Sequence, residues 1–459
     1  TNAGLRRLPR IGSFYWTNPM PAIIRDRGPD STSDGGRDGN RLKERIATQS
    51  ACNWMTVDAN RLGDAMTISF EWLIDPIEPS TFFEDYYEKK PLLVERRHAS
   101  KWASLLSVGV VDRYLSTSTP CRPDVFLVDS ARDLSPDDYS FPHSTPPGRI
   151  DLPRAYQLFA TGATISLSQL HEHVAPLARL CRAMEKTFSS HFQTNIYLSP
   201  PNAQGFKTHF DSHDVFVLQV SGSKQWTLYD TAIELPLRGQ AFDPDVHTAG
   251  PPTREFTLHA GDLFYCPRGL FHSARSTDET SLHITLGLIG KTWADVMLEA
   301  VSAACLATPA LRANLPVGFA NAGFDNSQAT ATFQTLLDTV ARDARLAPTL
   351  QQMAEDFVTS RRPAFDGCLL ECEATLLLSC KVVPRPDLIY LMREADDKLI
   401  VLFGASEISF PAHVRDALVF ALEQGPFTVQ DLPSLDDEDK LVLVGRLLKE
   451  GLLERQESP

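Results

Sequence analysis

Residues 192–290 constrain the fold of this 459-residue chain most, because short β-branched and aromatic runs alternate there with turn sequences. The runs are NIYLSPP, DVFVLQV, KQWTLYD, REFTLHA, DLFYCP and SLHITLGL, and the turns include SGS, AGD and PRG. Runs of this composition between Gly, Pro, Ser and Asp residues are typical of strands. A block of about 100 residues built in this way predicts a small barrel or a double sheet.

The stretch THFDSHDV inside this block places His209 and Asp211 two residues apart. If the stretch is a strand, both side chains lie on the same face, ~6.5–7 Å apart along the chain. An imidazole and a carboxylate at one point of a barrel provide two of the three ligands of a 2-His-1-carboxylate Fe(II) site. The pair alone is a weak signal, because a histidine at a strand edge beside a solvated aspartate has the same spacing.

The third ligand of such a site would come from a later strand that returns beside the first pair when the barrel closes. GDLFYCPRGLFHSA delivers His272 on the far side of the β block, and His283 in SLHITLGL competes with it for this position. His171 and His173 are predicted to lie on a helix that begins near Ser168. Residues two apart on a helix point to different sides, so this second pair is not expected to bind a metal.

Lys224 follows the SGS turn and begins the run KQWTLY. Strand alternation places it on the same face as Trp226 and Leu228. A lysine among bulky apolar neighbours needs an anion if that face is buried, and a dicarboxylate that binds iron through one end would supply one with its other end. The alternative is a lysine at the rim of the sheet, with its ammonium group in water.

Two long stretches of this chain, YLSPPNAQGFKTHFDSHDVFVLQVSGSKQWTLYD and GDLFYCPRGLFHSA, together resemble the JmjC-type ribosomal oxygenases, also called the cupin-4 family. The earlier stretch LIDPIEPSTFFEDYYEKKPLLVER is similar to the entry segment of that family, and the resemblance covers about residues 68–455. The position of His272 after PRG matches the family pattern, which favours His272 over His283 as the third ligand.

The resemblance implies an α+β fold with a double-stranded β-helix (JmjC/cupin) core, a helical dimerisation region and a C-terminal winged-helix-like domain. The sequence RDRGPDSTSDGGRDGNRLKER has little to bury, so the part of the chain that contains it is expected to be disordered or loosely attached. We therefore expect an extension at 1–65, the JmjC/cupin catalytic domain at 66–290, the dimerisation region at 291–365 and the winged-helix-like domain at 366–459.

The activity that the resemblance implies is that of an Fe(II)- and 2-oxoglutarate-dependent dioxygenase, a protein hydroxylase acting on a His or Arg side chain of a ribosomal protein. The implied iron ligands are His209, Asp211 and His272, and Lys224 is expected to bind the distal carboxylate of 2-oxoglutarate. The remaining implied roles fall on polar positions of the pocket: cosubstrate binding by Asn195 and Thr285, and substrate binding by Tyr197.

Gly287 departs from the family pattern, because the histidine hydroxylases of the family tend to carry a Ser near the substrate at this point. The residue to be hydroxylated is therefore left open, and so is the ribosomal target. The alternatives are a JmjC-type demethylase of methyl-lysine, a hydroxylase of another protein, and a non-catalytic cupin-fold binding protein. A winged-helix DNA regulator is disfavoured by the acidic run Asp436-Asp437-Glu438-Asp439.

Composition adds limits on partners and location. The net charge is −14, and because residues 1–65 contain ten Lys/Arg and seven Asp/Glu, the rest of the chain carries −17. An acidic body argues against direct nucleic-acid binding and is compatible with a basic protein partner. No apolar run reaches ~18 residues, so no membrane helix is expected, and eight scattered cysteines without a CxxC pair indicate reduced thiols. We expect a cytoplasmic homodimer.

Overall fold

The computed structural model describes residues 68–362, 365, 367–371 and 375–456. The chain divides into two units, Thr1–Ala65 and Met66–Pro459. The expected extension at 1–65 lies outside the described residues. The second unit begins with two short helices and an edge strand of the main sheet, which are α1 (Phe70–Ile74), α2 (Pro79–Asp85) and β1 (Leu92–Val94).

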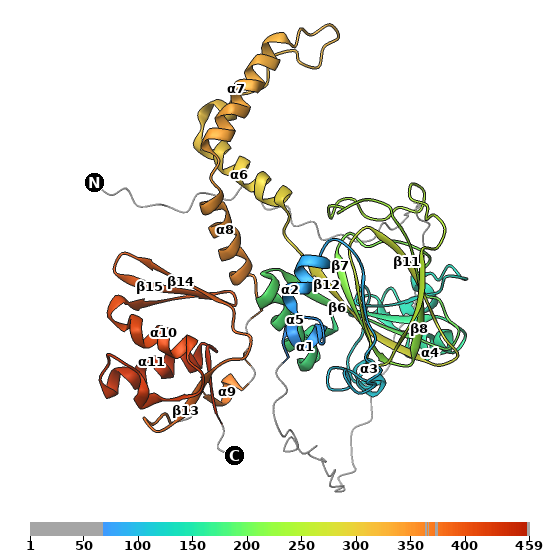
Figure 1. The fold of residues 1–459 in the computed structure, drawn as a ribbon, viewed down its shortest axis with the longest axis horizontal. Coiled ribbons are helices and arrows are strands. Elements are labelled where there is room, and N and C mark those ends of the chain that lie inside the picture. Colours follow the sequence, from blue (N-terminus) through green and yellow to red (C-terminus); the bar gives the residue numbers. More distant parts are fainter. Residues whose placement is uncertain (1–67, 363–364, 366, 372–374, 457–459) are drawn as a thin grey trace, which may run out of the picture. The chain divides into compact units, whose positions relative to one another are not determined.

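Two antiparallel sheets form the core that carries the site (Figure 1). The larger sheet has the order β1-β10-β7-β12-β6-β5-β2, and the smaller has the order β11-β8-β9. Strands that are far apart in the sequence are therefore neighbours, as a double sheet requires. Their bounds are β2 Val125–Val128, β5 Thr164–Ser168, β6 His191–Ser199, β7 Asp214–Ser221, β8 Ser223–Thr231, β9 Arg254–His259, β10 Leu263–Cys266, β11 Leu270–Ser276 and β12 Ser281–Ile289.

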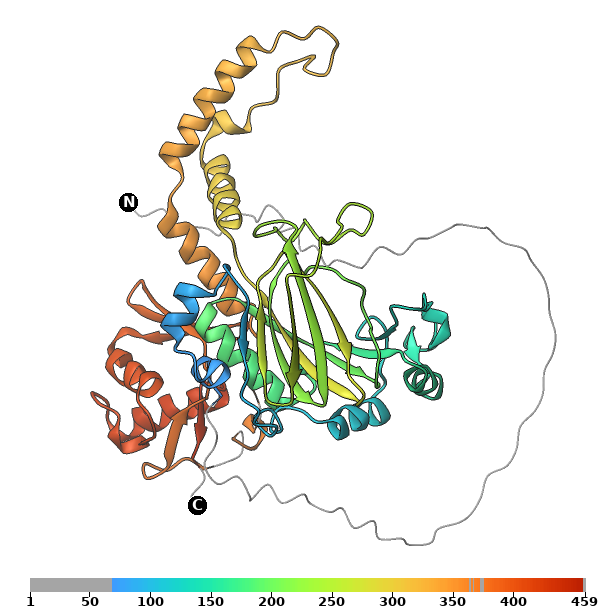
Figure 2. The ribbon, with the colours of Figure 1, turned by 45° about the vertical axis from the view of Figure 1, so that its right-hand side comes forward.

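Strand β7 is buried on both faces, which explains why its sequence DVFVLQV lacks the usual polar alternation. Val215 and Val217 belong to an apolar cluster between the two sheets, which also contains Trp226 of β8. Phe216 and Leu218, on the opposite face, belong to the larger core that the helices cover. The space between the sheets, whose strands are seen in Figure 2, is therefore a packed core with the site inside it.

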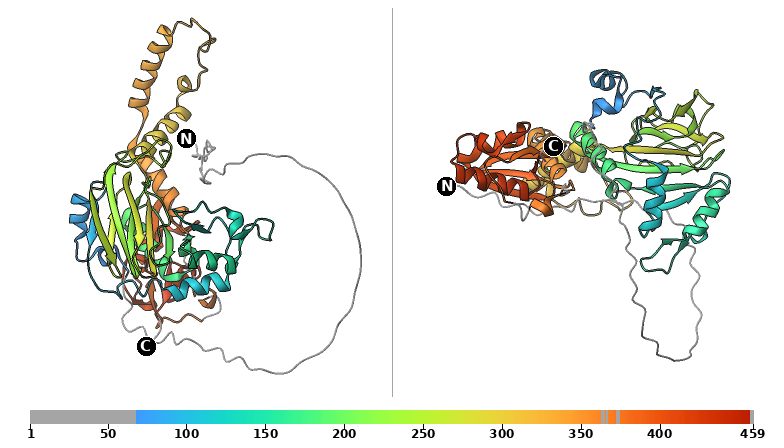
Figure 3. Two further views of the ribbon diagram at one scale, coloured as in Figure 1. Left: turned by 90° about the vertical axis from the view of Figure 1, so that its right-hand side faces the viewer. Right: turned by 90° about the horizontal axis from the view of Figure 1, so that it is seen from below.

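Helix α5 (Ala175–Phe188) contributes Leu177, Leu180 and Met184 to that larger core, on the side of β6 (Figure 3). The expectation of a helix from about Ser168 was wrong at its start. The backbone N–H of His171 donates to Thr194 Oγ1, and α5 begins later with a proline in its first turn, where proline is favoured. The remaining elements before α5 are α3 Val108–Thr117, η1 Pro136–Asp138, β3 Ser140–Phe141, β4 Arg149–Ile150, α4 Leu152–Ala160 and η2 Leu170–Glu172.

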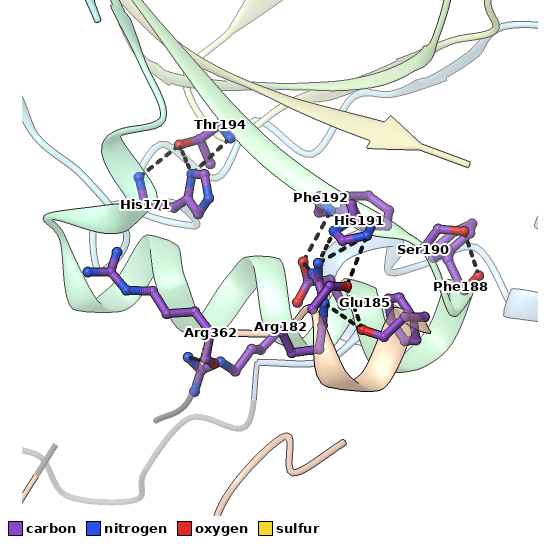
Figure 4. A network of polar contacts seen from close by, with 12 residues as sticks. His171, Arg182, Glu185, Phe188, Ser190, His191, Phe192, Thr194 and Arg362 are labelled. Atoms are coloured by element: carbon purple, nitrogen blue, oxygen red, sulfur yellow. Dashed lines mark hydrogen bonds and ion pairs between the residues drawn. The ribbon is translucent and has the colours of Figure 1, made fainter. Parts of the chain in front are cut away.

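A buried polar network fixes the start of β6, the strand that carries Asn195 and Tyr197 (Figure 4). Glu185 of α5 accepts a hydrogen bond from the backbone N–H of Phe192 at 3.3 Å and pairs with the guanidinium of Arg361. Arg361 also contacts the imidazole of His191. Removing one member would leave a buried charge without its partner, so this network is expected to hold β6 firmly.

Three long helices follow β12, and their apolar side chains are exposed in part. Helix α6 begins with a capping box in which Thr292 and Asp295 bond each other's backbone N–H. Among the described residues, no helix is both long and apolar enough to cross a membrane. The elements are α6 Trp293–Ala307, η3 Pro309–Arg312, α7 Ser327–Asp343 and α8 Leu346–Thr359, and their most exposed large apolar residues are Trp293, Met297, Leu298 and Phe333.

The described residues of the C-terminal part form two small sheets and three α-helices, of which α9 is short, and this is more β structure than the strand-strand-helix-helix order expected from its sequence. The expected hairpin is present: β14 and β15 are joined by Asp396 and Asp397, whose φ values of 50° and 60° fit a tight two-residue turn. The missed strands are short and irregular in pattern. The elements are α9 Cys368–Glu371, β13 Lys381–Pro384, β14 Tyr390–Ala395, β15 Lys398–Phe403, β16 Ser406–Pro411, η4 Ala412–Val414, α10 Arg415–Glu423, β17 Phe427–Thr428, η5 Val429–Asp431, α11 Asp437–Lys449 and β18 Leu453–Arg455.

Candidate metal centre

The structure brings His209, Asp211 and His272 together inside the double sheet. One ligand atom from each lies within 4.8 Å of the others. The Nε2 atom of His272 is 3.7 Å from Oδ2 of Asp211, and the two imidazole centroids are 4.6 Å apart. Two imidazoles and one carboxylate at this separation form the donor set that suits non-haem Fe(II).

The backbone places these ligands through an isolated bridge rather than through a regular strand. The N–H of His209 donates to the carbonyl of His272 at 3.1 Å, and the N–H of His272 donates back at 2.8 Å. The expectation that 208–215 is a continuous strand was therefore wrong, since β7 begins only at Asp214. The two-residue spacing still brings His209 and Asp211 to one point.

The PRG turn that precedes His272 requires its glycine. Gly269 has φ of +85°, and a Cβ there would lie 2.0 Å from the carbonyl oxygen of Ile233. Its N–H donates to the carbonyl of Asp211 at 2.9 Å. This bond is a second link between the two segments that carry the ligands, so the turn sets the separation of Asp211 and His272.

The protonation states suit metal binding at neutral pH. His209 Nδ1 and His272 Nδ1 lie 2.8 Å and 3.0 Å from the carbonyl oxygens of Lys207 and Leu270. A carbonyl can only accept, so both Nδ1 atoms carry the proton and both Nε2 atoms are free to bind a metal. Burial lowers the pKa of His272 to about 4. Burial alone would raise the pKa of the Asp211 carboxyl, but the neighbouring histidines outweigh it and lower that pKa.

A buried ion pair supports the two ligand-bearing segments. Arg268, at the PRG turn, donates to Oδ2 of Asp214 at 2.8 Å and also pairs with Glu88. The hydroxyl of Tyr265 donates to the other oxygen of Asp214 at 2.6 Å. Because Asp214 follows Asp211 by three residues and Arg268 precedes His272 by four, this pair is a third link between the segments.

Lys224 is buried on the pocket face of β8, with 4% of its surface exposed. Its ammonium group donates to Ser199 Oγ at 3.1 Å, and Ser199 shares a hydrogen bond of 2.9 Å with Thr164. Burial lowers the pKa of Lys224 to about 7. An ammonium group in such a place is stabilised by a bound anion, so the alternative of a lysine at the rim was wrong.

Two further buried atoms in this pocket, the Nε1 of Trp226 and the Nδ1 of His283, have no hydrogen-bond partner among the residues that the structure describes. Buried polar groups are normally bonded to protein, water or ligand. Together with the Lys224 ammonium group they fit a polar, anionic molecule of the kind that 2-oxoglutarate represents. The residues present therefore fit the cosubstrate expected from the sequence.

His283 lies apart from the three candidate ligands. Its ring stacks on Tyr197 with a centroid distance of 4.9 Å and contacts Trp226 at 6.0 Å. Burial, and then the nearby Lys224, lower the pKa of His283 far below its usual range, so it is neutral. His272, and not His283, shares the metal-ligand group with His209.

Asn195, Tyr197 and Thr285 lie on neighbouring strands of the larger sheet. Asn195 pairs with Thr285 across β6 and β12, and Tyr197 pairs with His283. Alternation along both strands puts all four side chains on the face towards Lys224. The placement is compatible with the roles expected from the sequence, which stay predictions. Sequence reasoning missed four residues that support the site, because their partners are distant in the chain: Thr164, Ser199, Asp214 and Arg268.

Comparison with known proteins identifies the class of the central domain. Residues 169–296 match the JmjC domain. Ribosomal oxygenase 1 of Danio rerio is 28% identical over 309 residues, which cover 66% of this chain and 56% of that protein. The bifunctional lysine-specific demethylase and histidyl-hydroxylase NO66 of Branchiostoma floridae is 27% identical over 506 residues, covering 99% of this chain and 78% of that protein.

The structure of YcfD, a ribosomal oxygenase from Escherichia coli in complex with cobalt and 2-oxoglutarate, covers 83% of this chain and 99% of its own. The sequence identity is 15% and the TM-score is 0.48. The chain spans about half the length of the first curated relatives that it matches, 56% of the protein from Danio rerio and 51% of ribosomal oxygenase 1 from Bos taurus.

The chain carries a JmjC domain and is similar in sequence to ribosomal oxygenases, so the resemblance noted from its motifs is confirmed. Residues 169–296 therefore belong to the JmjC domain class, for which the sequence analysis expects Fe(II) and 2-oxoglutarate. The assembled His-Asp-His group agrees with that class and with both cofactors expected from the sequence.

Proposed function

We propose that this protein is an Fe(II)- and 2-oxoglutarate-dependent oxygenase that hydroxylates a His or Arg side chain of a ribosomal protein. The observation that carries the proposal is the assembled group of His209, Asp211 and His272 beside a buried lysine in a JmjC domain. Fe(II) and 2-oxoglutarate, when bound, would activate O₂, so that one of its oxygen atoms is inserted into a C–H bond and the other enters succinate, with release of CO₂.

The residues of the chain hold and orient the reactants. His209, Asp211 and His272 would bind the iron on one side and leave its remaining positions open. Lys224, held by Ser199, would pair with the distal carboxylate of 2-oxoglutarate. The aromatic and aliphatic side chains between the sheets keep water out of this pocket, which strengthens each charged contact.

Asn195 and Thr285 are proposed to contact the cosubstrate. They pair with each other across β6 and β12, and they lie on the same face of the sheet as His283, which lines the pocket. Tyr197 is proposed to contact the substrate. Burial raises the pKa of the Tyr197 phenol well above its usual range, so it is a neutral hydrogen-bond donor at any working pH.

A ribosomal protein is the proposed substrate on two grounds. Relatives of the chain are named ribosomal oxygenases, and the net charge of −14 favours the approach of a basic protein. The alternative is demethylation of a methyl-lysine, since a relative is named a lysine-specific demethylase and histidyl-hydroxylase. That reaction would use the same iron and cosubstrate and differ only in which C–H bond lies beside the metal.

We also propose a homodimer formed through the helical region 291–365. The support is the exposed apolar surface of α6 and α7, on which Trp293 and Leu298 are each 72% exposed and Phe333 is 59% exposed. Apolar patches of this kind on a helix mark interaction surfaces. A monomeric mass in solution at micromolar protein would exclude the dimer. The winged-helix-like domain at 366–459 and the cytoplasmic location stay predictions.

The proposed reaction is tested by incubating the protein with Fe(II), ascorbate, 2-oxoglutarate and proteins extracted from purified ribosomes. We expect succinate, and a mass increase of about 16 Da, one oxygen atom, on one ribosomal protein. His209→Ala and Lys224→Ala should abolish both signals, whereas the exposed control His259→Ala should retain them. Loss of a methyl group instead would support the demethylase, and the absence of succinate with every protein fraction would contradict an oxygenase.

A further inference from the structure

Gly287 stands where the histidine hydroxylases of the family tend to carry a serine. In this structure the side chain of His213 occupies the space in front of this glycine. Gly287 lies on β12 between Gln193 of β6 and Val215 of β7. A Cβ at this position would lie 2.9 Å from Nε2 and 3.0 Å from Cδ2 of His213. Contacts shorter than 3.0 Å essentially never occur around a real Cβ, so a side chain at 287 would require the His213 imidazole to move from its present position.

The direction of this contact puts the His213 imidazole inside the pocket. Side chains alternate along a strand, so Gly287 presents the same face as Thr285 and His283. His283 lies beside Lys224 and Trp226, as described above. The point at which His213 meets Gly287 is therefore on the pocket face, four residues and ~13 Å further along β12 than His283.

His213 is also close to the candidate metal ligands without belonging to their group. It follows Asp211 by two residues, and the Nε2 and Cδ2 atoms of its ring lie in front of Gly287 on β12. It is absent from the group of three residues whose ligand atoms lie within 4.8 Å of one another. Its ring is thus near the metal centre and available for contacts with another molecule.

The surroundings of His213 are polar and differ from those of Lys224. The Cγ of Gln193 lies 3.6 Å from the position of a Cβ on Gly287, and Asn195 presents the same face of β6 two residues further on. His283, Thr285 and Gly287 are the residues of β12 that face the pocket. Lys224, the proposed anion-binding residue, lies near His283, at the end opposite Gly287. The His213 end is therefore left for the group that is to be oxidised.

We propose that His213 is a substrate-positioning residue that hydrogen-bonds the polar side chain presented to the metal, and that Gly287 is a glycine because His213 needs its space. The proposal rests on the proposed oxygenase function and deepens it. According to this proposal, the imidazole of His213, on the segment before β7, selects the substrate side chain together with Gln193. These two residues take the place of a serine hydroxyl at position 287 on β12.

The first test is a double-mutant cycle on stability and metal binding, which needs no substrate. Gly287→Ser should lower the unfolding temperature, because the new side chain collides with His213. In the His213→Ala background the same substitution should have little effect, since the space is then free. Co(II) affinity should change by less than about threefold in His213→Ala, a change smaller than the loss of one hydrogen bond produces. Equal effects of Gly287→Ser in both backgrounds would overturn the proposed contact.

The second test measures product formation as a function of the concentration of ribosomal-protein extract. His213→Ala should raise KM by about three- to tenfold, the size of one lost hydrogen bond, with a smaller change in kcat. His213→Gln retains a hydrogen-bonding group and should recover part of the loss. His259→Ala, an exposed histidine on β9, is the matched control and should leave KM unchanged.

The outcomes separate this proposal from the proposed function. If the unmodified protein forms no product with any extract, the oxygenase function fails and the role of His213 fails with it. If the unmodified protein forms product and His213→Ala has the same KM, only the role of His213 is overturned. A loss of Co(II) affinity of about threefold or more in His213→Ala, ~0.65 kcal/mol, would show that His213 supports the metal and does not position the substrate.

Discussion

The buried ammonium group of Lys224 makes a specific prediction for the pH dependence of stability and of cosubstrate binding. Burial lowers its pKa from 10.5 to about 7. Below pH 7 the ammonium group of Lys224 is charged in both the folded and the unfolded protein. The folded state then bears the full cost of burying this charge. Between about pH 7 and pH 10.5 the unfolded chain binds more protons, so the free energy of unfolding rises with pH. The substitution Lys224→Met should remove this slope and stabilise the ligand-free protein at pH 7 by on the order of 4 kcal/mol.

A bound dicarboxylate reverses this situation, because its distal carboxylate favours the charged lysine. 2-Oxoglutarate should therefore bind with uptake of nearly one proton at pH 8 and should lose about 50-fold in affinity between pH 7 and pH 9. Calorimetric titration with Mn(II) in place of Fe(II), in buffers of different ionisation enthalpy, measures the proton uptake directly. Lys207→Met is the matched control, since Lys207 is exposed and lies two residues before His209. Affinity that does not change with pH, or no proton uptake, would refute the assignment of Lys224 as the carboxylate partner.

Three further predictions concern the support, the ligands and the dimer. Arg268→Met should cost ~3–5 kcal/mol in urea unfolding, because the Asp214 carboxylate is left buried without its cation. The double variant Arg268→Met with Asp214→Asn should lose less free energy of unfolding than the two single variants added together. As a control, breaking the exposed ion pair between Arg446 and Glu450 should cost ~0–1 kcal/mol. Equal losses at the two sites would contradict the buried pair. Asp211→Asn should abolish tight Co(II) binding in calorimetry, and a retained dissociation constant would remove Asp211 from the ligand set. Leu298→Glu should convert a dimer to a monomer in light scattering, and an unchanged dimer mass would remove α6 from the interface.

The candidate ligands could be found from the sequence because the spacing of His209 and Asp211 is local. The third ligand could not be derived in the same way. His272 lies on β11 and His283 on β12, two strands that both come after the first pair in the sequence, and only their places in the folded sheets separate them. The register of β12 against β6 places His283 opposite Tyr197 and beside Lys224. The family resemblance favoured His272, the histidine that lies together with His209 and Asp211, whereas periodicity alone left both open.

The errors in the sequence analysis have a common physical cause, which is that tertiary contacts override a local pattern. The helix expected from Ser168 begins later, because the Thr194 side chain of β6 bonds the backbone of His171. The strand expected through Asp211 is interrupted, because its backbone bonds the turn at Gly269 instead of a continuous neighbour. Local propensity is a weak prior wherever such distant partners exist.

Gly287 shows the same limit for function, and it changes how the substrate should be predicted. In the sequence, a glycine in place of a serine is only the loss of a hydroxyl group. In the structure, the space in front of that glycine is filled by His213 from a different segment, so the pocket exchanges one polar group for another. Under the proposed function, the choice of the side chain to be hydroxylated is therefore predicted from the pair 213/287 rather than from position 287 alone. Relatives that carry a small residue at 213 and a serine at 287 are expected to differ from this protein in the residue they select.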